Sequence, residues 1–137
     1  MLSAKLRQLI ATAPLAHLAT LNQDGSPQVS VVWIAIDGDE LVTSHMGRYL
    51  KVRNVERDPR VVISLEAPPE EGAFLAPHAV IKATATVVGP TEDAWELLNQ
   101  MAKVYLAPDA EFPAPRGAGY ILRHRVERVG GVGPWAQ

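Results

Sequence analysis

Two Asp-Gly pairs near the N-terminus constrain the fold more than any other feature of the sequence. Asp24-Gly25 lies between two apolar, β-branched runs, residues 16–21 and 28–36, and Asp37-Gly38 leads into a third at 40–44. Asp-Gly favours tight hairpin turns, because glycine adopts the positive φ that such turns require. The spacing predicts that these three runs are strands of an antiparallel meander.

The remaining sequence adds further strands and short helices. Alternating or β-branched segments predict strands at 61–66, 79–88 and 120–129. Helical periodicity predicts helices over 3–12, 49–56 and from Thr91 to about Tyr105. About six strands and three helices in so short a chain predict a mainly β (α+β) fold, a small antiparallel barrel with short covering helices. We expect one domain over residues 1–137, ending in a flexible tail at about 130–137.

Composition excludes several functional classes. The chain has no cysteine, so disulfides and thiolate chemistry are ruled out. Its net charge of -2 and pI near 6.1 argue against a dedicated nucleic-acid binder. No apolar run is long enough to predict a membrane span, and residues 1–7 lack a long apolar run, so we expect no secretory signal. The expectation is a cytoplasmic protein.

The segment 46–60 is the most basic part of the sequence. It holds five of the thirteen Lys and Arg residues, although the chain as a whole is slightly acidic. On a helix, Arg48, Lys51 and Asn54 would form one polar row, because residues three apart are neighbours. A cationic row that follows a strand suits an anionic ligand, most simply a phosphate.

No catalytic constellation accompanies this basic segment. The sequence lacks the glycine-rich signatures of dinucleotide and nucleotide binding and the serine motif of hydrolases. Its four histidines are scattered, so we expect no metal site, and a lone histidine after a strand, such as His45, is usually incidental. An anion-binding helix without acid/base machinery favours an enzyme whose cofactor carries the chemistry. No catalytic residue is assigned.

The order of several short motifs resembles a known superfamily. These are Leu18-Ala19-Thr20-Leu21, Asp24-Gly25-Ser26-Pro27, Val31-Val32-Trp33, Lys51-x-x-Asn54 and Asp58-Pro59-Arg60-Val61. Together they resemble the pyridoxamine 5′-phosphate oxidase-like superfamily, whose fold is the FMN-binding split β-barrel. Within it, the Lys-x-x-Asn helix, the Asp-Pro-Arg-Val that follows and the short length look most like the flavin/deazaflavin oxidoreductases that depend on coenzyme F420.

The resemblance implies a homodimer with two cofactor sites at its interface. It places the cofactor phosphate beside Arg48, Lys51 and Asn54, with further contacts from Thr43 and Ser44. It also implies that the ring lies along the strand residues Ser30, Val31, Val32 and Trp33. The second subunit would contribute His78, Lys82 and Trp135 to the same site.

The implied activity is hydride transfer from reduced coenzyme F420 to an electron-poor small molecule, such as an enone or another activated alkene. Two alternatives remain open. One is an FMN-binding oxidase or reductase on the same fold, and the other is a non-catalytic module that binds a cofactor or haem. The sequence departs from true pyridoxamine phosphate oxidases in two ways. Its basic residues are spaced Arg-x-x-Lys, closer together than in their motif, and the residues given after Val129 do not resemble their C-terminal segment for pyridoxal phosphate. The loops 67–77 and 107–119 are the expected substrate pocket.

Overall fold

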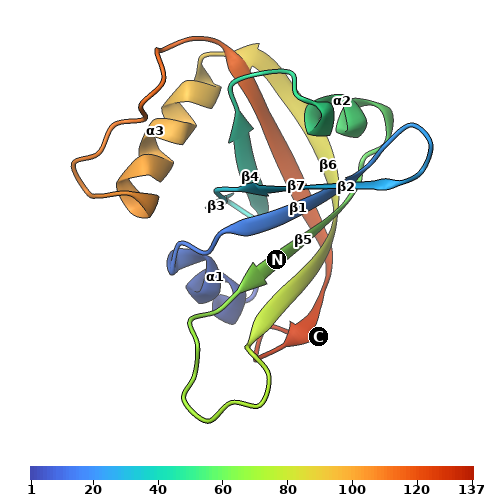
Figure 1. Cartoon of the computed structure of the whole chain (residues 1–137), viewed down its shortest axis with the longest axis vertical. Coiled ribbons are helices and arrows are strands. Elements are labelled where there is room, and N and C mark those ends of the chain that lie inside the picture. Colours follow the sequence, from blue (N-terminus) through green and yellow to red (C-terminus); the bar gives the residue numbers. More distant parts are fainter.

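The computed structural model describes the whole chain, residues 1–137, as ten elements (Figure 1). In chain order they are α1 (Ala4–Ala11), β1 (Ala16–Leu21), β2 (Pro27–Val32), β3 (Ala35–Asp37), β4 (Glu40–His45), α2 (Leu50–Arg57), β5 (Arg60–Glu66), β6 (His78–Thr91), α3 (Asp93–Tyr105) and β7 (Gly119–Val132).

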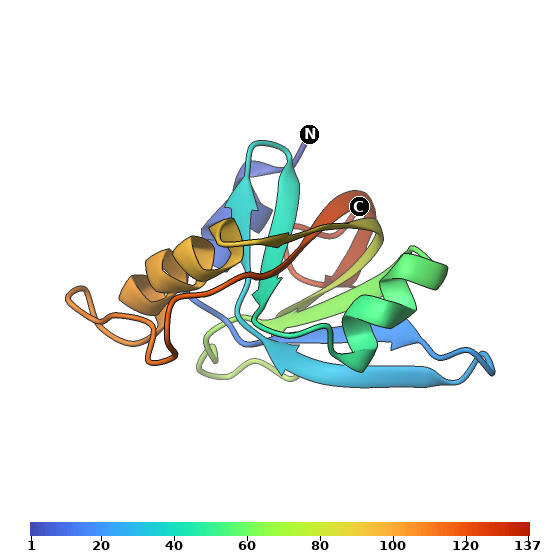
Figure 2. The same ribbon diagram turned by 90° about the horizontal axis from the view of Figure 1, so that it is seen from above.

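The seven strands form one antiparallel sheet in the order β2-β1-β5-β6-β7-β4-β3. The sheet is strongly curved, and the three helices lie separately around it (Figures 1 and 2). The mainly β split-barrel fold is therefore confirmed, with seven strands in place of about six. None of the three helices combines the length and apolarity that crossing a membrane requires.

The strand predicted over 28–36 is in fact two strands at opposite ends of the sheet. β2 pairs with β1, whereas β3 pairs with β4, and the chain breaks between them at Trp33 and Ile34. The hydroxyl of Tyr105 holds this break, since it accepts a hydrogen bond from the Ile34 N–H at 3.1 Å and donates one to the Pro14 carbonyl at 2.7 Å. Both Asp-Gly hairpins form, but the expected continuous meander is wrong.

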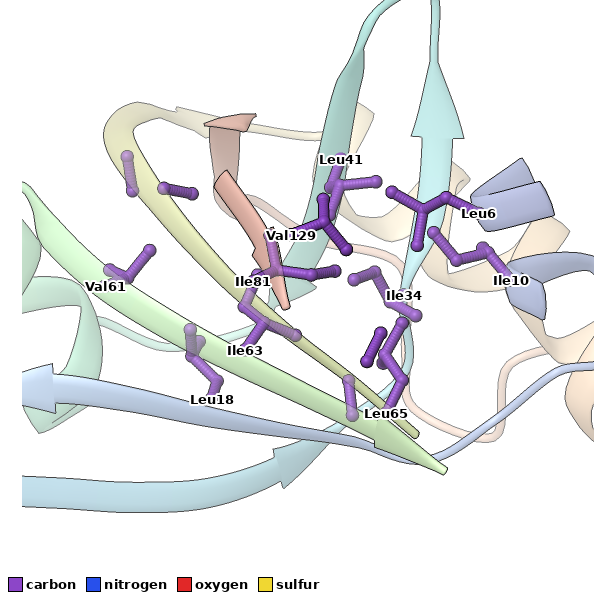
Figure 3. Close-up of a cluster of buried hydrophobic side chains, with 14 of the residues drawn as sticks. Leu6, Ile10, Leu18, Ile34, Leu41, Val61, Ile63, Leu65, Ile81 and Val129 are labelled. Atoms are coloured by element: carbon purple, nitrogen blue, oxygen red, sulfur yellow. The ribbon is translucent and has the colours of Figure 1, made fainter. Parts of the chain in front are cut away.

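Alternate residues of the strands fill the barrel interior. Leu18, Ile63 and Ile81 come from three neighbouring strands, and all three are fully buried (Figure 3). The period of two puts one face of each strand into this core and leaves the other face outside. Leu6 and Ile10 of α1 close one end of the barrel (Figure 3).

The C-terminal tail does not extend freely from the fold, contrary to expectation. β7 continues to Val132, where it still pairs with β6, and the Gln137 N–H donates to the Val129 carbonyl at 3.0 Å. The Trp135 side chain is 8% exposed, packs in the main core and donates its indole N–H to the His78 carbonyl at 2.8 Å. A large apolar ring with a satisfied polar atom fixes the segment in place.

Candidate functional site

A cleft opens where the free edge of β2, the end of β4 and the start of α2 meet. Its volume is about 300 Å³. β2 hydrogen-bonds only to β1, so every second residue of β2 turns its backbone N–H and C=O away from the sheet. The cleft is lined by Leu15, Val31, Val32, Trp33, Ser44, His45, Met46, Tyr49, Lys51, Leu98 and Phe112.

Lys51 is the cation of this cleft. Its ammonium donates to the Ser30 hydroxyl at 3.2 Å and lies 5.5 Å from the centre of the Tyr49 ring. Three Lys or Arg side chains in the chain are half-buried, and of these Arg7 and Arg123 have carboxylate partners but Lys51 has none. Burial lowers the pKa of Lys51. A partly desolvated ammonium without a counter-ion is chemically able to pair with an incoming anion.

Arg48 does not extend this charge into the cleft. The helix begins only at Leu50, so Arg48 precedes it and the expected polar row does not form. Its guanidinium instead makes two bonds to the Glu56 carboxylate, at 2.8 and 2.9 Å, which raise the pKa of Arg48 and lower that of Glu56. Both side chains are at the surface, so an arriving anion would have to compete with Glu56.

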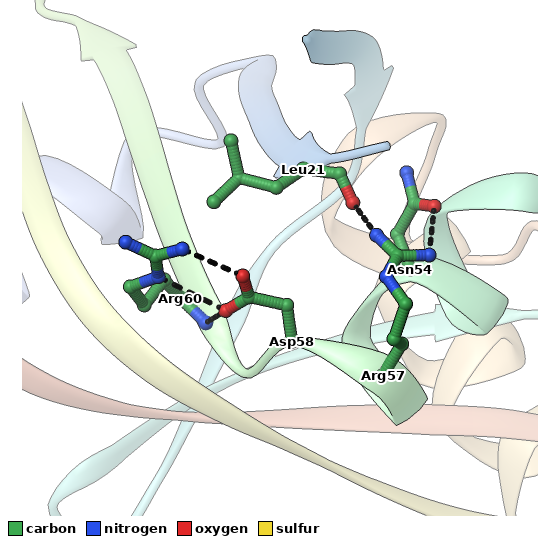
Figure 4. A network of polar contacts seen from close by, with 5 residues as sticks. All are labelled: Leu21, Asn54, Arg57, Asp58 and Arg60. Carbon is green, nitrogen blue, oxygen red and sulfur yellow. Dashed lines mark hydrogen bonds and ion pairs between the residues drawn. The ribbon is translucent and has the colours of Figure 1, made fainter. Parts of the chain in front are cut away.

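Asn54 is fully buried and serves the fold. Its amide donates to the Thr20 hydroxyl at 3.0 Å and to the Asn22 side-chain oxygen at 2.9 Å, which ties α2 to β1 and the turn after it. Arg57 donates to the Asn54 oxygen and to the Leu21 carbonyl (Figure 4). Because every side-chain polar atom of Asn54 already has a hydrogen-bond partner, none is left to contact a phosphate directly.

The turn after α2 is closed by a second local pair. Asp58 accepts hydrogen bonds from both the backbone and the guanidinium of Arg60 (Figure 4). The side-chain bonds from Arg60 are the main reason that the pKa of Asp58 falls to about 2. The Asp58-Pro59-Arg60 part of the quoted motif therefore starts β5, outside the cleft.

Thr43 and Ser44 face opposite sides of β4. Ser44 lines the cleft, and its hydroxyl donates to the Ala94 carbonyl of α3 at 2.7 Å. Thr43 is fully buried inside the barrel, where its hydroxyl lies 3.0 Å from Nε2 of both His45 and His124. The Thr43 side chain therefore does not line the cleft with Ser44, because successive residues of a strand point to opposite faces.

His45 is a cleft residue that sequence reasoning dismissed. Its ring lines the cleft although the residue is only 4% exposed. Burial, followed by the charges of Lys51 and His124, lowers the pKa of His45 to about 3, and burial lowers that of His124 to about 4. Both imidazoles are thus neutral at physiological pH. The alternation of β4 already placed Thr43 and His45 on one face, which was the available signal.

The break between β2 and β3 gives the cleft an aromatic wall. Trp33 stacks on Tyr105, with ring centres 5.2 Å apart and planes 13° from parallel, and meets the edge of Phe112 at 6.2 Å. The structure therefore does gather the predicted Val31, Val32 and Trp33 around Lys51, with Ser30 in contact. Phe112 comes from the loop 107–119, as expected for a pocket loop, but Met46, Tyr49 and Leu98 had no sequence signal.

Three predicted residues lie elsewhere in this chain. His78 and Lys82 point outward from β6, and Trp135 is in the core. None of them lines the cleft. His78 and Lys82 could reach a cofactor only from a second subunit, and the indole of Trp135 is buried in the core of its own chain.

Another polar hollow lies on the far side of α2. It has a volume of about 520 Å³ and is lined by Asn22, Gln23, Asp24, Leu50, Arg53, Asn54 and Arg57. Arg57 is already bonded to the Leu21 carbonyl, Asp24 adds negative charge and Arg53 is exposed, so this hollow has no half-buried cation like Lys51. No group of three or more His, Asp or Glu side chains is arranged to hold a metal ion.

Several proteins of known structure have the same fold as this chain. An F420 reductase is 26% identical, with a TM-score of 0.73 over 90% of this chain and 94% of that one. A conserved hypothetical protein from Mycobacterium tuberculosis is 21% identical, with a TM-score of 0.76 over 94% and 82%. The HupZ protein of Group A Streptococcus is 16% identical, with a TM-score of 0.67 over 100% and 98%. The latter two likenesses show the fold alone, and no curated protein sequence matches this chain.

The family is shown by the sequence itself. The profile of the pyridoxamine 5′-phosphate oxidase family matches residues 2–133, which is nearly the whole chain. The matched region includes all seven strands, α2 and every residue of the cleft. The chain therefore belongs to the pyridoxamine 5′-phosphate oxidase family.

Proposed function

We propose that this protein is an oxidoreductase that binds reduced coenzyme F420 in the Lys51 cleft and reduces an electron-poor alkene or enone. The observation that carries the proposal is the half-buried ammonium of Lys51, which has no carboxylate partner and lies beside the free edge of β2. The likeness to an F420 reductase at 26% identity supports this choice of cofactor.

The cleft divides into regions that suit different parts of such a cofactor. Lys51 and the Ser30 hydroxyl would hold a phosphate, while the backbone edge of β2 offers donors and acceptors to the polar side of a ring. Trp33, with Phe112 at its edge, gives an apolar wall that keeps water from the other parts of the ring. When bound, the cofactor supplies hydride chemistry, and the protein binds and orients it.

FMN is the second candidate, because it also joins a phosphate to a flavin-type ring. Parallel titration of the purified protein with F420 and FMN, followed by fluorescence, separates the two. Selective F420 binding, with oxidation of bound reduced F420 on addition of an enone, is the expected result. Selective FMN binding would move the activity to a flavin oxidase or reductase, and binding of neither would refute a cofactor role for the cleft.

Lys51→Ala should weaken binding of the phosphate-bearing cofactor by about 1.5–3 kcal/mol, or roughly 10- to 150-fold in Kd, because it removes a charge-assisted contact. The titration described above measures this loss. Lys5→Ala is the matched control, since Lys5 is an exposed lysine on α1, and it should bind as the wild type does. Equal affinity of Lys51→Ala and Lys5→Ala would show that Lys51 does not hold the phosphate.

We also propose that the outer face of β2, β1 and β5 is the interface of a homodimer. Val29 and Val62 are 59% and 37% exposed, and both pair with Ala19 in register, so they form one apolar row on the surface. Val31, 55% exposed, extends this row on β2. The next residue across from Val62 is Lys82, which would then border the partner. Exposed apolar patches of this kind mark protein interfaces.

Val62→Glu should weaken the dimer by at least about 3 kcal/mol, or roughly 150-fold, since it buries an unpaired carboxylate in the interface. Sedimentation velocity over a range of concentrations measures the change. Val104→Glu, on the exposed side of α3, introduces the same charge away from this face and should leave the dimer intact. A wild-type protein that is monomeric at micromolar concentration would refute the interface.

A further inference from the structure

A chain of three polar side chains crosses the barrel interior to the cleft. The Thr43 hydroxyl on β4 lies 3.0 Å from Nε2 of His124 on β7 and 3.0 Å from Nε2 of His45 at the end of β4. All three residues are buried, with His124 and Thr43 fully so. His45 alone of the three lines the cleft.

The two remaining imidazole nitrogens differ in their surroundings. Nδ1 of His124 is sealed in the interior without a hydrogen-bond partner, and it is the one buried side-chain nitrogen or oxygen in this condition. Nδ1 of His45 also bonds to nothing in the chain but is not sealed, since its ring forms part of the cleft wall. The protons of the three side chains must be distributed under these constraints.

Only one distribution leaves no buried donor unpaired. Each neutral imidazole carries one N–H, and Thr43 carries one O–H. If Nε2–H of His124 donates to Thr43, and Thr43 donates to Nε2 of His45, then Nδ1 of His124 is an unpaired acceptor and Nδ1 of His45 carries a proton. If the direction is reversed, His124 buries an unpaired N–H, and if both rings donate, the Thr43 O–H is orphaned. Orphaned buried donors are rarer than orphaned acceptors.

We propose that His45 presents Nδ1–H to the cleft as a neutral hydrogen-bond donor, and that it binds a carbonyl oxygen or an unprotonated ring nitrogen of the ligand. The ligand role rests on the proposed function, because flavin-type rings carry both kinds of acceptor. Thr43 and His124 are positioning residues, which act by fixing the tautomer of His45. This gives Thr43 a function in the site although it never touches the ligand.

The groups around His45 suit this division of roles. The cation that faces it is Lys51 of α2, and on β7 it faces His124 and pairs in register with Tyr120. A positive charge beside the ring opposes a second one, so His45 contributes a neutral donor while Lys51 attracts the anion. The cleft can thereby recognise the charged and uncharged parts of one ligand separately.

The tautomers can be read without a ligand or a variant. Nitrogen-15 NMR of the wild-type imidazoles at neutral pH distinguishes a protonated from an unprotonated ring nitrogen. The expected result is Nδ1–H for His45 and Nε2–H for His124. An Nε2–H tautomer for His45 would overturn the proposal directly, whether or not the cleft binds a cofactor.

Variants of Thr43 test the ligand role. Thr43→Val removes the hydroxyl and should weaken F420 or FMN binding about tenfold, with the tautomer of His45 no longer fixed. Thr43→Ser keeps the hydroxyl and should bind within about twofold of the wild type. Thr86→Val makes the same exchange at an exposed position of β6 and should change neither binding nor the His45 signals.

The outcomes separate the two claims. If the wild type binds a cofactor and Thr43→Val binds it equally well, the ligand role of His45 is overturned while the proposed function stands. If the wild type binds neither F420 nor FMN, the proposed function fails and the ligand role fails with it. Amide spectra of Thr43→Val confirm that it is folded, and Thr43→Ser gives the same comparison if it is not.

Discussion

Trp135→Ala is expected to lower the free energy of unfolding by about 3–5 kcal/mol, the usual loss when a buried large aromatic is truncated. The indole is 8% exposed and packs in the main core, and its N–H satisfies the His78 carbonyl. The truncation removes apolar contact area and leaves that carbonyl without its partner. If the tail were flexible, the substitution would leave the free energy of unfolding almost unchanged.

Urea unfolding monitored by far-UV circular dichroism measures the effect. Phe74→Ala is the matched control, because Phe74 is 98% exposed in the loop before β6, and it should change stability by less than about 0.5 kcal/mol. Equal midpoints for the two variants would contradict the burial of Trp135. A loss of cofactor affinity with unchanged stability would instead support the cofactor contact that the family resemblance implied for Trp135.

Acidification from pH 7 to pH 5 is expected to cost about 2 kcal/mol of stability for each of His45 and His124, or roughly 4 kcal/mol together. The folded pKa values, about 3 and about 4, lie below the unfolded value near 6.5. In this window the unfolded state binds protons that the folded state does not, so stability falls as pH falls. The loss of stability depends little on the exact pKa values of the two histidines in the folded state, provided that both are below 5.

Urea denaturation at pH 7, 6 and 5 checks this expectation. Most carboxylates titrate below pH 5, so the histidines cause most of the change in stability between pH 7 and pH 5. His124→Asn, whatever its own stability, should retain about half of the wild-type pH dependence. A stability that is flat between pH 7 and pH 5 would show that these imidazoles accept protons in the folded protein.

The local elements could be predicted from the sequence because their causes are local. The turns at Asp24-Gly25 and Asp37-Gly38, the alternation of β6 and the apolar stripe of α3 depend on residues a few positions apart. The ordered motifs also identified the superfamily. The basic segment also contains Lys51, which lines the cleft.

The arrangement of these elements depended on contacts between distant residues. Tyr105 is far along the chain from Ile34, yet its hydroxyl holds the break that separates β2 from β3 and exposes the edge of β2. Asn54 was expected to face a phosphate, but its amide is taken by Thr20 and Asn22. A sequence pattern shows which residues share a helix face, but it does not show which of those residues already have hydrogen-bond partners elsewhere in the fold.

Local sequence patterns were enough to predict the fold class and the family, and they singled out Lys51, which lines the cleft. Three other features became visible only in the folded chain: Arg48 is paired with Glu56, Thr43 lies inside the barrel, and His45 lines the cleft. These features could not be predicted because burial and hydrogen-bond partners arise only when distant segments pack together. The same residue type can bind a ligand or stabilise the fold, depending on which neighbouring groups contact it in the packed chain.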